Sequence, residues 1–501
     1  MKQIIGGYVG TTWDDFLVLP GAPKDDEPFT PEDVDLSINL AGIDLRIPFL
    51  AAAMRSVTGR DLALAAGKSG MMAVAPRGLS VEKEVEIVRH VKENAVGVNQ
   101  IESEYRPTKV LNTCSLGEAL DVSRKMGHSN IPVVTDKAEL VGVFQYKPSR
   151  HDLMDMNTPI EREMVRYKNG NGDNQGLKVC RAGMSDDEIK AFMEENKLRF
   201  VPVIDGVGRV ERLIFLQLKP GYRVGAAIDT HPGWEARAEE LAAAGADMIF
   251  TDTSDAHKRF ARDVISRYKN MFRNGPPICG GNVVTPDGFN YLVDAGADAI
   301  KIGMGPGSIC TTNEVLGVGA PPFWSLVEVA KERDKLARAG KYVTVIADGG
   351  IEGTDNIAVA LTYVDAIMGG RIFGCFLESE GDRVDRSGKI YPRERLQEEN
   401  IVAIKIFGEG SAESRATTGD MGRYTAPTST HGVATYQGVS GTVQYRGRFK
   451  PGVENYANTI REAFYHTGSR TPAEYRKNAS LIRLSERARR TAAPHGIHVI
   501  G

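Results

Sequence analysis

Short, mostly apolar segments recur along the chain, and segments with helical amphipathic periodicity lie between them. Strands of this kind are buried on both faces, and their alternation with helices indicates parallel strands joined by right-handed crossovers. The eight segments are residues 49–53, 71–75, 224–229, 248–252, 278–282, 299–303, 344–350 and 366–370. Eight such units predict an α/β fold, the (β/α)8 TIM barrel. A doubly wound open sheet is the structural alternative, but it usually contains fewer strands.

The barrel pattern is interrupted between its second and third predicted strands by a segment that contains an internal repeat. Residues 130–144 are echoed by residues 200–215, and an amphipathic helical segment precedes each copy. These helices are expected at 116–126 and 186–196. The repeat predicts two small α/β units that bury their apolar faces against each other. The expected division is a barrel of residues 1–99 and 221–501 with an insertion at 100–220.

Composition and charge limit the classes of function. With 501 residues, 42% of them hydrophobic and 25% charged, the chain has the composition of a soluble globular protein. The formal net charge of -3 and the absence of a basic block in the sequence argue against nucleic acid as the main partner. The first residues lack the pattern of a signal peptide, and no apolar run is long enough for a transmembrane helix. We therefore expect a cytoplasmic protein without a membrane partner.

One cysteine stands in a glycine-rich loop directly after the sixth predicted strand. The segment 303–312 reads GMGPGSICTT, and its three glycines in five residues allow the backbone to approach a ligand closely. Cys310 at the end of this loop is a candidate nucleophile, whereas Cys114, Cys180, Cys279 and Cys375 have apolar or strand-like surroundings. The odd number of cysteines, without CxxC spacing, argues against a disulfide framework and against a zinc site.

Polar and glycine residues end the other predicted strands, and barrel enzymes act at this end of the strands. Glycine pairs follow strands seven and eight, at 349–350 and 369–370, with Arg371 beside the second. Exposed backbone N–H groups and an arginine suit a phosphate dianion, and Asp348 can accept two vicinal ribose hydroxyls. Together these features predict a nucleotide site. The loop at 303–308 is not a dinucleotide fingerprint, because serine stands at the last glycine position.

Several motifs carry a resemblance to a known family. They are DDFLVLPG at 14–21, GMGPGSICTT at 303–312, Asp-Gly-Gly at 348–350, GEGS at 408–411 and QGVSG at 437–441. Over nearly its whole length the chain resembles the inosine 5′-monophosphate (IMP) dehydrogenase family. The insertion resembles a pair of cystathionine-β-synthase (CBS) domains, a Bateman module, which commonly binds adenine or guanine nucleotides. A purely structural appendage is the alternative for this pair.

The resemblance implies NAD-dependent oxidation of IMP to xanthosine 5′-monophosphate, in guanine nucleotide biosynthesis, by a homotetramer that binds potassium. Cys310 would attack carbon 2 of the hypoxanthine ring, and hydride would leave to the nicotinamide. A flap at about residues 412–437, carrying Arg423 and Tyr424, would then support hydrolysis of the covalent intermediate. Thr312 would position the water. Some relatives have glutamate where this chain has Gln437.

Further site residues follow from the resemblance. Substrate-binding positions are Met54, Ser308, Asp348, Gly349, Gly350, Gly370, Arg371, Gly408, Glu409, Gly410 and Gln437. Positions expected near NAD are Asp252, Thr253, Ser254, Asn282, Gly303, Met304 and Gly305. Potassium would be held by backbone carbonyls of Gly305, Gly307 and Cys310, completed by a neighbouring subunit's C-terminal segment, here 494–496. Ile406 and Ala52 replace a tyrosine and a serine of the family, and Arg371 is the expected compensation at the phosphate.

Two other functions are compatible with parts of this pattern. GMP reductase shares the barrel and the cysteine loop but performs an NADPH-dependent reductive deamination of GMP to IMP. It performs no hydrolysis, so Arg423 and Tyr424 favour the dehydrogenase. A non-catalytic purine-nucleotide sensor is the alternative from another class, and the presence of Cys310 and of the flap motif counts against it.

Overall fold

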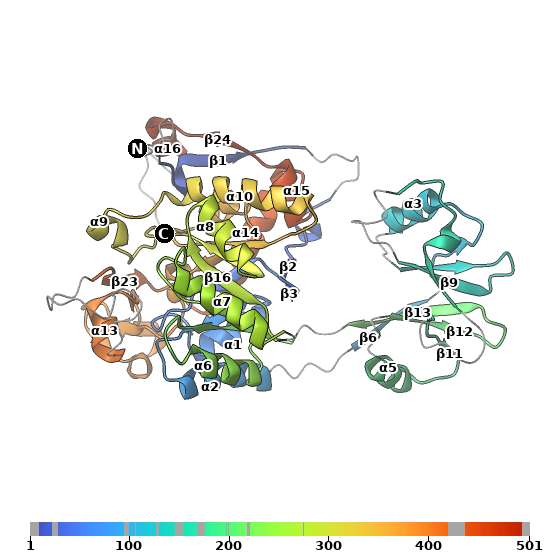
Figure 1. Cartoon of the computed structure of the whole chain (residues 1–501), viewed down its shortest axis with the longest axis horizontal. Coiled ribbons are helices and arrows are strands. Elements are labelled where there is room, and N and C mark those ends of the chain that lie inside the picture. Colours follow the sequence, from blue (N-terminus) through green and yellow to red (C-terminus); the bar gives the residue numbers. More distant parts are fainter. Residues whose placement is uncertain are drawn as a thin grey trace. The chain divides into compact units, whose positions relative to one another are not determined.

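The chain forms two compact units. One consists of Met1–Val96 and Pro220–Gly501, and the other of Gly97–Lys219 (Figure 1). The computed structural model describes residues 10–22, 29–94, 100–105, 107–126, 130–145, 154–167, 176–196, 198, 200–217, 221–273, 275–418 and 436–492.

The larger unit contains a closed barrel of eight parallel strands. The strands are β4 (Phe49–Ala51), β5 (Met72–Ala75), β14 (Arg223–Ile228), β15 (Met248–Thr251), β16 (Ile278–Val283), β17 (Ala299–Ile302), β18 (Thr344–Asp348) and β19 (Ala366–Gly369). Each pairs with its neighbour in sequence order, β5 pairs with β14 across the insertion, and β19 pairs with β4 to close the barrel. The predicted TIM barrel is therefore confirmed.

Helices surround the barrel strands (Figure 1). They are α1 (Arg60–Ser69), α2 (Val81–Glu93), α6 (Trp234–Ala243), α7 (Arg259–Met271), α8 (Pro286–Asp294), α10 (Pro322–Arg338), α11 (Thr354–Ala360) and α14 (Phe449–His466). Two short helices, α9 (Thr312–Leu316) and α12 (Arg371–Gly374), lie in the segments that follow β17 and β19. Inside the barrel, alternate strand residues such as Met72, Phe250 and Met368 form an apolar cluster. The hairpin of β2 (Ile38–Leu40) and β3 (Ile43–Leu45) contributes to this cluster. Because apolar side chains fill the barrel interior, a ligand site is expected among the loops that follow the strands.

A second small sheet stands beside the barrel and carries one of the expected site loops. It contains β20 (Asp382–Val384), β21 (Ile390–Tyr391), β22 (Ala403–Phe407) and β23 (Ser440–Gln444) in the order β21-β20-β22-β23. The loop at 408–410 follows β22 and leads into α13 (Ala412–Thr418). Ile406 is fully buried in the apolar cluster of this sheet, which is consistent with the loss of a polar side chain there.

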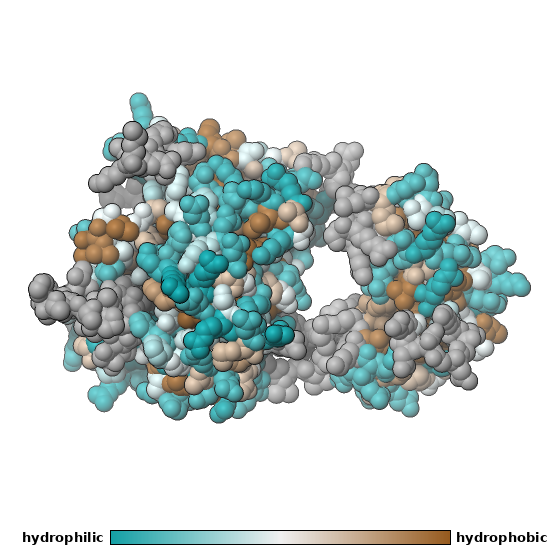
Figure 2. Space-filling view, viewed as in Figure 1, coloured by the Kyte–Doolittle hydropathy of each residue, from teal (hydrophilic) through white to brown (hydrophobic). Residues whose placement is uncertain are grey.

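Most of the remaining elements of this unit lie towards the ends of the chain, and two 3-10 helices lie between β21 and β22. These elements are 3-10 helices at Trp13–Asp15, Pro31–Asp33, Arg393–Arg395 and Glu398–Asn400, strand β1 (Phe16–Leu19), helix α15 (Pro472–Asn478), strand β24 (Ser480–Arg483) and helix α16 (Glu486–Ala492). Strands β1 and β24 pair antiparallel. Figure 2 shows hydrophobic residues gathered over α9, where Val315, Leu316 and Val318 are exposed. No helix in the described part of the chain is both long enough and apolar enough to cross a membrane.

The smaller unit is built from two similar halves. One contains β7 (Val110–Leu111), α3 (Leu116–Met126), β8 (Asn130–Val134), β9 (Leu140–Gln145), a 3-10 turn at Ile160–Arg162 and β10 (Met164–Arg166). The other contains β11 (Cys180–Arg181), α5 (Asp186–Glu195), β12 (Phe200–Ile204) and β13 (Val210–Gln217), with β6 (Gln100–Tyr105) at its edge. Val134, Leu140 and Val143 share an apolar cluster with Ile204, Val210 and Leu213. The two halves therefore bury their apolar faces against each other; that they are CBS domains stays a prediction.

Helix α2 carries a buried carboxyl group. Glu84 is fully buried and pairs with Arg237 of α6, which also donates to the Leu79 carbonyl. Burial raises the pKa of Glu84 to about 8, although Arg237 favours the charged form. This carboxyl group therefore gains its proton far more readily in the folded protein than in the unfolded chain.

Replacing Glu84 with glutamine should change how stability depends on pH. Because the folded pKa of about 8 exceeds the ordinary value of 4.5, the folded state binds more protons between these values. Glu84 therefore lowers the free energy of unfolding as the pH rises from about 4.5 to about 8. In thermal unfolding scans, the melting temperature of Glu84→Gln relative to wild type should rise by about 1–2 °C per pH unit in this window. Parallel curves would contradict the raised pKa.

Candidate functional site

A cavity of about 160 Å3 lies at the carboxyl ends of the barrel strands. Seventeen of the expected site residues line it: Met54, Asp252, Thr253, Ser254, Asn282, Gly303, Met304, Gly305, Gly307, Cys310, Thr312, Asp348, Gly349, Gly408, Glu409, Gly410 and Gln437. The other lining residues are Ala52, Ala53, Lys301, Pro306, Ile309 and Met368. Segments from six barrel strands and from the loop after β22 thus meet in one place.

The other four expected substrate-binding residues, Ser308, Gly350, Gly370 and Arg371, lie beside this cavity. Ser308 and Arg371 both contact the Glu352 carboxylate, and Gly370 lies against Met54. Gly350 lies against Pro306 of the cysteine loop. Arg423 and Tyr424 fall outside the described residues, as does the segment 494–496. Of the expected flap, the described parts are residues 412–418 and 436–437.

The loop that carries Cys310 is fixed by its own backbone and by the segment before β23. The Cys310 N–H donates to the Gly307 carbonyl at 2.9 Å, and the Val439 N–H donates to the Ile309 carbonyl at 3.0 Å. Cys310 and Gly438 form an isolated antiparallel bridge. The Cys310 thiol therefore lies at the end of a tight turn, and the segment before β23 is hydrogen-bonded to this turn.

A chain of polar contacts leads away from the thiol. Cys310 Sγ and Thr312 Oγ1 lie 3.1 Å apart, and Thr312 Oγ1 donates to Gln437 Oε1 at 3.3 Å. Thr312 and Gln437 are both buried. The Thr311 N–H also donates to the Gln437 carbonyl at 3.1 Å, which fixes the two segments relative to each other. The thiol is thus held beside a hydroxyl and an amide.

Two glycines in this region are required by close packing. Gly303 has φ of +142°, and a Cβ atom there would lie 2.0 Å from the Asp348 carbonyl oxygen. Gly305 has φ of +86°, and a Cβ atom there would lie 1.8 Å from Asn313 Oδ1. Any larger residue would push the cysteine loop away from β18 or from Asn313.

The other four cysteines differ from Cys310 in their surroundings. Burial raises the pKa of Cys279 to about 12 and the pKa values of Cys180 and Cys375 to about 11, and it also raises the pKa of Cys114. Their thiols stay protonated at neutral pH and are poor nucleophiles. Cys310 lines the cavity. Cys310 thus differs from the other four cysteines in its surroundings, and its role as the nucleophile stays a prediction.

A buried lysine holds the carboxylate that was expected to bind ribose. Lys301 Nζ lies 2.9 Å from Asp348 Oδ2, and the lysine side chain is only 6% exposed. Asn282 Nδ2 donates to the same oxygen at 2.9 Å and to the Gly303 carbonyl at 2.7 Å. The sequence interpretation missed Lys301, although a single lysine within the apolar strand 299–303 was a signal that it needs a buried partner.

The amide of Asn282 is left with one free acceptor. Its nitrogen makes two hydrogen bonds to acceptors, so the assignment of nitrogen and oxygen is fixed by the contacts. Asn282 Oδ1 is buried and has no hydrogen-bond partner within the described ranges. A ligand that donates a hydrogen bond to this buried acceptor satisfies it, which makes the free energy of ligand binding more favourable.

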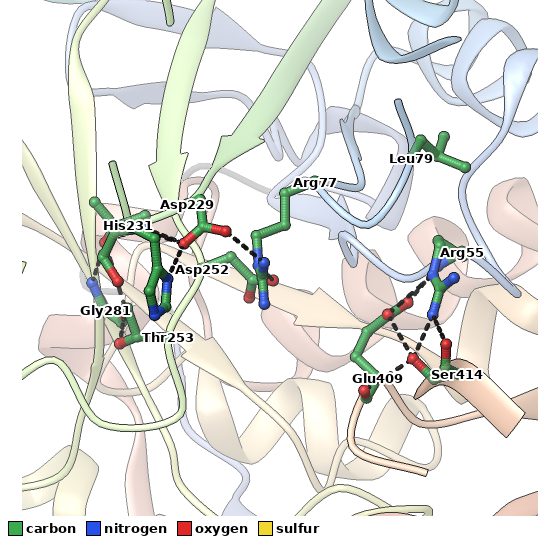
Figure 3. A network of polar contacts seen from close by, with 12 residues as sticks. Arg55, Arg77, Leu79, Asp229, His231, Asp252, Thr253, Gly281, Glu409 and Ser414 are labelled. Atoms are coloured by element: carbon green, nitrogen blue, oxygen red, sulfur yellow. Dashed lines mark hydrogen bonds and ion pairs between the residues drawn. The ribbon is translucent and has the colours of Figure 1, made fainter. Parts of the chain in front are cut away.

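A second charged network orients Asp252 (Figure 3). Arg77, which follows β5, lies 2.8 Å from Asp229 and 3.2 Å from Asp252, and its side chain is buried. Burial alone would raise the pKa of Asp229, but Arg77 and His231 outweigh burial and leave the pKa below its ordinary value. Thr253 donates to the Gly281 carbonyl at 3.1 Å. Asp252 is therefore anchored by Arg77, a residue that the sequence interpretation did not identify.

A third contact fixes Glu409 (Figure 3). The Arg55 backbone N–H donates to Glu409 Oε1 at 2.7 Å, and Arg55 Nε lies 3.1 Å from Glu409 Oε2. Arg55 Nη2 donates to the carbonyl and hydroxyl oxygens of Ser414. Both oxygens of the Glu409 carboxylate are engaged, which holds the 408–410 loop against the Met54 segment. Glu409 also lines the cavity, and its expected part in substrate binding stays a prediction.

Within the described ranges, no three His, Cys, Asp or Glu side chains come together to hold a metal ion. The expected potassium ligands are the backbone carbonyls of Gly305, Gly307 and Cys310. All three belong to one tight loop. Potassium binds oxygen donors, so these groups are of the right kind.

Comparisons with known proteins place this geometry in context. A family model described as "IMP dehydrogenase / GMP reductase domain" matches residues 10–495. The chain is 31% identical to the IMP dehydrogenase of Escherichia coli (strain K12) over 492 residues, covering 95% of this chain and 93% of that one. It is 28% identical to the enzyme of Aquifex aeolicus (strain VF5) over 509 residues, covering 98% and 96%.

A solved structure is also similar. The crystal structure of a GMP reductase variant from Trypanosoma brucei, in complex with guanosine 5′-monophosphate, has a TM-score of 0.66 and 23% sequence identity. The match covers 98% of this chain and 99% of that chain. At this level of identity the likeness concerns the fold.

Proposed function

Because the chain belongs to the IMP dehydrogenase / GMP reductase family of oxidoreductases, we propose that it oxidises IMP to xanthosine 5′-monophosphate with NAD, for guanine nucleotide synthesis. The curated relatives of 28–31% identity over nearly the whole chain are named IMP dehydrogenase. The observation that carries the proposal is the Cys310 thiol in one cavity with the Asp348 carboxylate and the Asn282 amide. This is the arrangement that a nucleotide oxidation through a covalent intermediate requires.

The substrate is held at three points. Asp348 accepts the ribose hydroxyls, while Lys301 and Asn282 hold its carboxylate in place. The phosphate binds beside the cavity, at Ser308, Gly350, Gly370 and Arg371. The base lies against Met54, the 408–410 loop and Gln437, which all line the cavity. Carbon 2 of the base is thereby presented to Cys310.

The reaction has two stages. First the Cys310 thiolate adds to carbon 2, and the hydride on that carbon leaves to the nicotinamide ring of NAD. This stage forms a carbon–sulfur bond and yields a thioimidate and NADH. A water molecule then adds to carbon 2 and the carbon–sulfur bond breaks, which gives xanthosine 5′-monophosphate, regenerates the thiolate and releases one proton.

The residues at the polar end of the cavity fit NAD. The buried Asn282 Oδ1 lacks a partner among the described residues and suits the carboxamide N–H of nicotinamide. Asp252, anchored by Arg77, suits the hydroxyls of the nicotinamide ribose, and Thr253 and Ser254 stand beside it. When bound, NAD supplies the hydride acceptor.

Hydrolysis needs a group that activates water. Thr312, between the thiol and Gln437, is placed to orient a water molecule by its hydroxyl. Gln437 cannot take a proton as a carboxylate would, so the proton must leave by another group. We assign this role to Arg423 with Tyr424, as the family resemblance implies.

Four further features stay predictions. Backbone carbonyls of Gly305, Gly307 and Cys310 would hold potassium. The exposed apolar residues over α9 would be covered in a homotetramer. The paired units at Gly97–Lys219 would bind an adenine or guanine nucleotide as CBS domains. The protein would act in the cytoplasm.

An activity assay tests the proposal directly. Incubation of the full chain with IMP and NAD should produce NADH, measured by absorbance, together with stoichiometric xanthosine 5′-monophosphate. Incubation with GMP and NADPH should leave NADPH unchanged. NADPH consumption with GMP, without any NADH from IMP, would identify a GMP reductase instead. Nucleotide binding without turnover in either assay would identify a sensor.

A further inference from the structure

The two side chains that the proposed function assigns to the substrate phosphate are already engaged by one carboxylate. Arg371 Nη2 lies 2.9 Å from Glu352 Oε2, and Ser308 Oγ donates to Glu352 Oε1 at 3.4 Å. Glu352 lies in the loop between β18 and α11, four residues after Asp348 at the end of β18. A carboxylate thus stands where the phosphate oxygens of the substrate are expected.

The Glu352 side chain can move away from Arg371 and Ser308 while its backbone stays in place. The Glu352 N–H donates to Asn356 Oδ1 at 2.9 Å, and Asn356 Nδ2 donates to Asp14 Oδ1 at 2.9 Å, so the backbone at this position is fixed. The Glu352 side chain is nevertheless 56% exposed. Exposed ion pairs contribute little to stability, so moving this side chain into water costs little.

Arg371 retains a donor that Glu352 does not satisfy. Arg371 Nε is buried and has no hydrogen-bond partner among the described residues. A phosphate has three acceptor oxygens and two negative charges, so it can bond to a guanidinium at two nitrogens while also accepting from Ser308. A phosphate therefore satisfies this pair of residues more completely than a carboxylate does.

We propose that Glu352 occupies the phosphate subsite while no nucleotide is bound and competes with the phosphate of the mononucleotide for Arg371 and Ser308. This inference rests on the proposed function in so far as the phosphate of IMP binds at this subsite. Glu352 thereby lowers the affinity for 5′-phosphorylated ligands, because each binding event must first displace it. It is a specificity-determining residue whose removal strengthens binding.

Replacing Glu352 with glutamine tests the competition. The full-length Glu352→Gln protein should bind IMP about 3- to 10-fold more tightly than wild type in isothermal titration calorimetry, because a neutral amide competes weakly for a guanidinium. The affinity for inosine, which lacks the phosphate, should not change. In an Arg371→Gln background the gain from Glu352→Gln should shrink, since the contested cation is gone.

A matched control separates this effect from a general change in charge. Arg60 and Glu86 form a pair of similar length and exposure away from the cavity, at 2.8 Å with side chains 51% and 55% exposed. Glu86→Gln should leave the IMP affinity as in wild type. Weaker or unchanged IMP binding by Glu352→Gln would overturn the inference, as would equal tightening for inosine.

The binding measurement does not depend on turnover. If wild type binds IMP but forms no NADH, the proposed reaction is refuted while the Glu352 comparison still stands. If wild type forms NADH and Glu352→Gln binds IMP no more tightly, only the competition by Glu352 is refuted.

Discussion

Replacement of Cys310 with alanine should lower NADH formation from IMP by a factor of about 10^4 or more, because no other group can form the bond to carbon 2. IMP binding should persist, since Asp348 and its partners Lys301 and Asn282 are untouched. Steady-state kinetics and calorimetric binding on the same preparation measure both effects. Acid-quenched wild type should also show a protein mass raised by one nucleotide, and the variant should not.

Cys114 provides the matched control for this substitution. It is also half-buried, but it packs in the apolar cluster of the smaller unit. Cys114→Ala should keep turnover at the wild-type level. Retained turnover in Cys310→Ala, or loss of turnover in both variants, would refute the assignment of the nucleophile.

Replacement of Lys301 with methionine should lower kcat/KM for IMP by a factor of about 100 or more. Without the lysine, Asp348 keeps only the Asn282 amide among the described residues, and its partly buried carboxylate either rotates within the cavity or turns towards water. In either case it no longer accepts the ribose hydroxyls in the same geometry. The measurement is initial-rate kinetics with IMP varied, followed by NAD varied, since the loss should appear mainly in the KM for IMP.

A lysine in a pair of equal length but greater exposure elsewhere controls for the loss of a lysine as such. Lys269 in α7 lies 2.9 Å from Asp298, the residue directly before β17. Lys269→Met should leave kcat/KM near the wild-type value. Because Lys301→Met removes a buried partner, Asp348→Asn offers a second variant that keeps the shape of the site and should show a similar loss. A folded Lys301→Met with kcat/KM within about threefold of wild type would contradict the role, given the cost of breaking buried pairs.

The barrel could be predicted from the sequence because its signal is local. Each barrel strand is a run of residues buried on both faces, as in Met248–Thr251, and a run of this kind is visible without knowledge of its partners. The sheet β21-β20-β22-β23 was not predicted. Its strands have two to five residues, and β22 pairs with β23 more than thirty positions later, so no local pattern distinguishes them from loops.

The same distinction separates the site residues that were predicted from those that were missed. Glycine and aspartate at the ends of strands share one edge of the barrel by topology, so Asp348 and Cys310 could be placed together from the sequence. The partners of charged groups could not. Arg55 meets Glu409 across 354 positions of sequence, and Arg77 meets both Asp229 and Asp252 only after the barrel has closed. A pairing of this kind depends on tertiary packing and leaves no spacing to detect.

The first and last strands of the insertion pair with each other, so its two ends lie side by side. Its first strand, β6, pairs antiparallel with its last, β13, and Gln100 stands opposite Gln217. For the barrel, the excursion between α2 and β14 therefore acts as a short connection. An unstructured loop of the same length would cost about 2 kcal/mol more in closure entropy than one of about ten residues. Pairing of the two strands offsets this cost within the insertion, so this unit can change in sequence, or be excised and replaced by a short loop, without preventing β14 from pairing with β5.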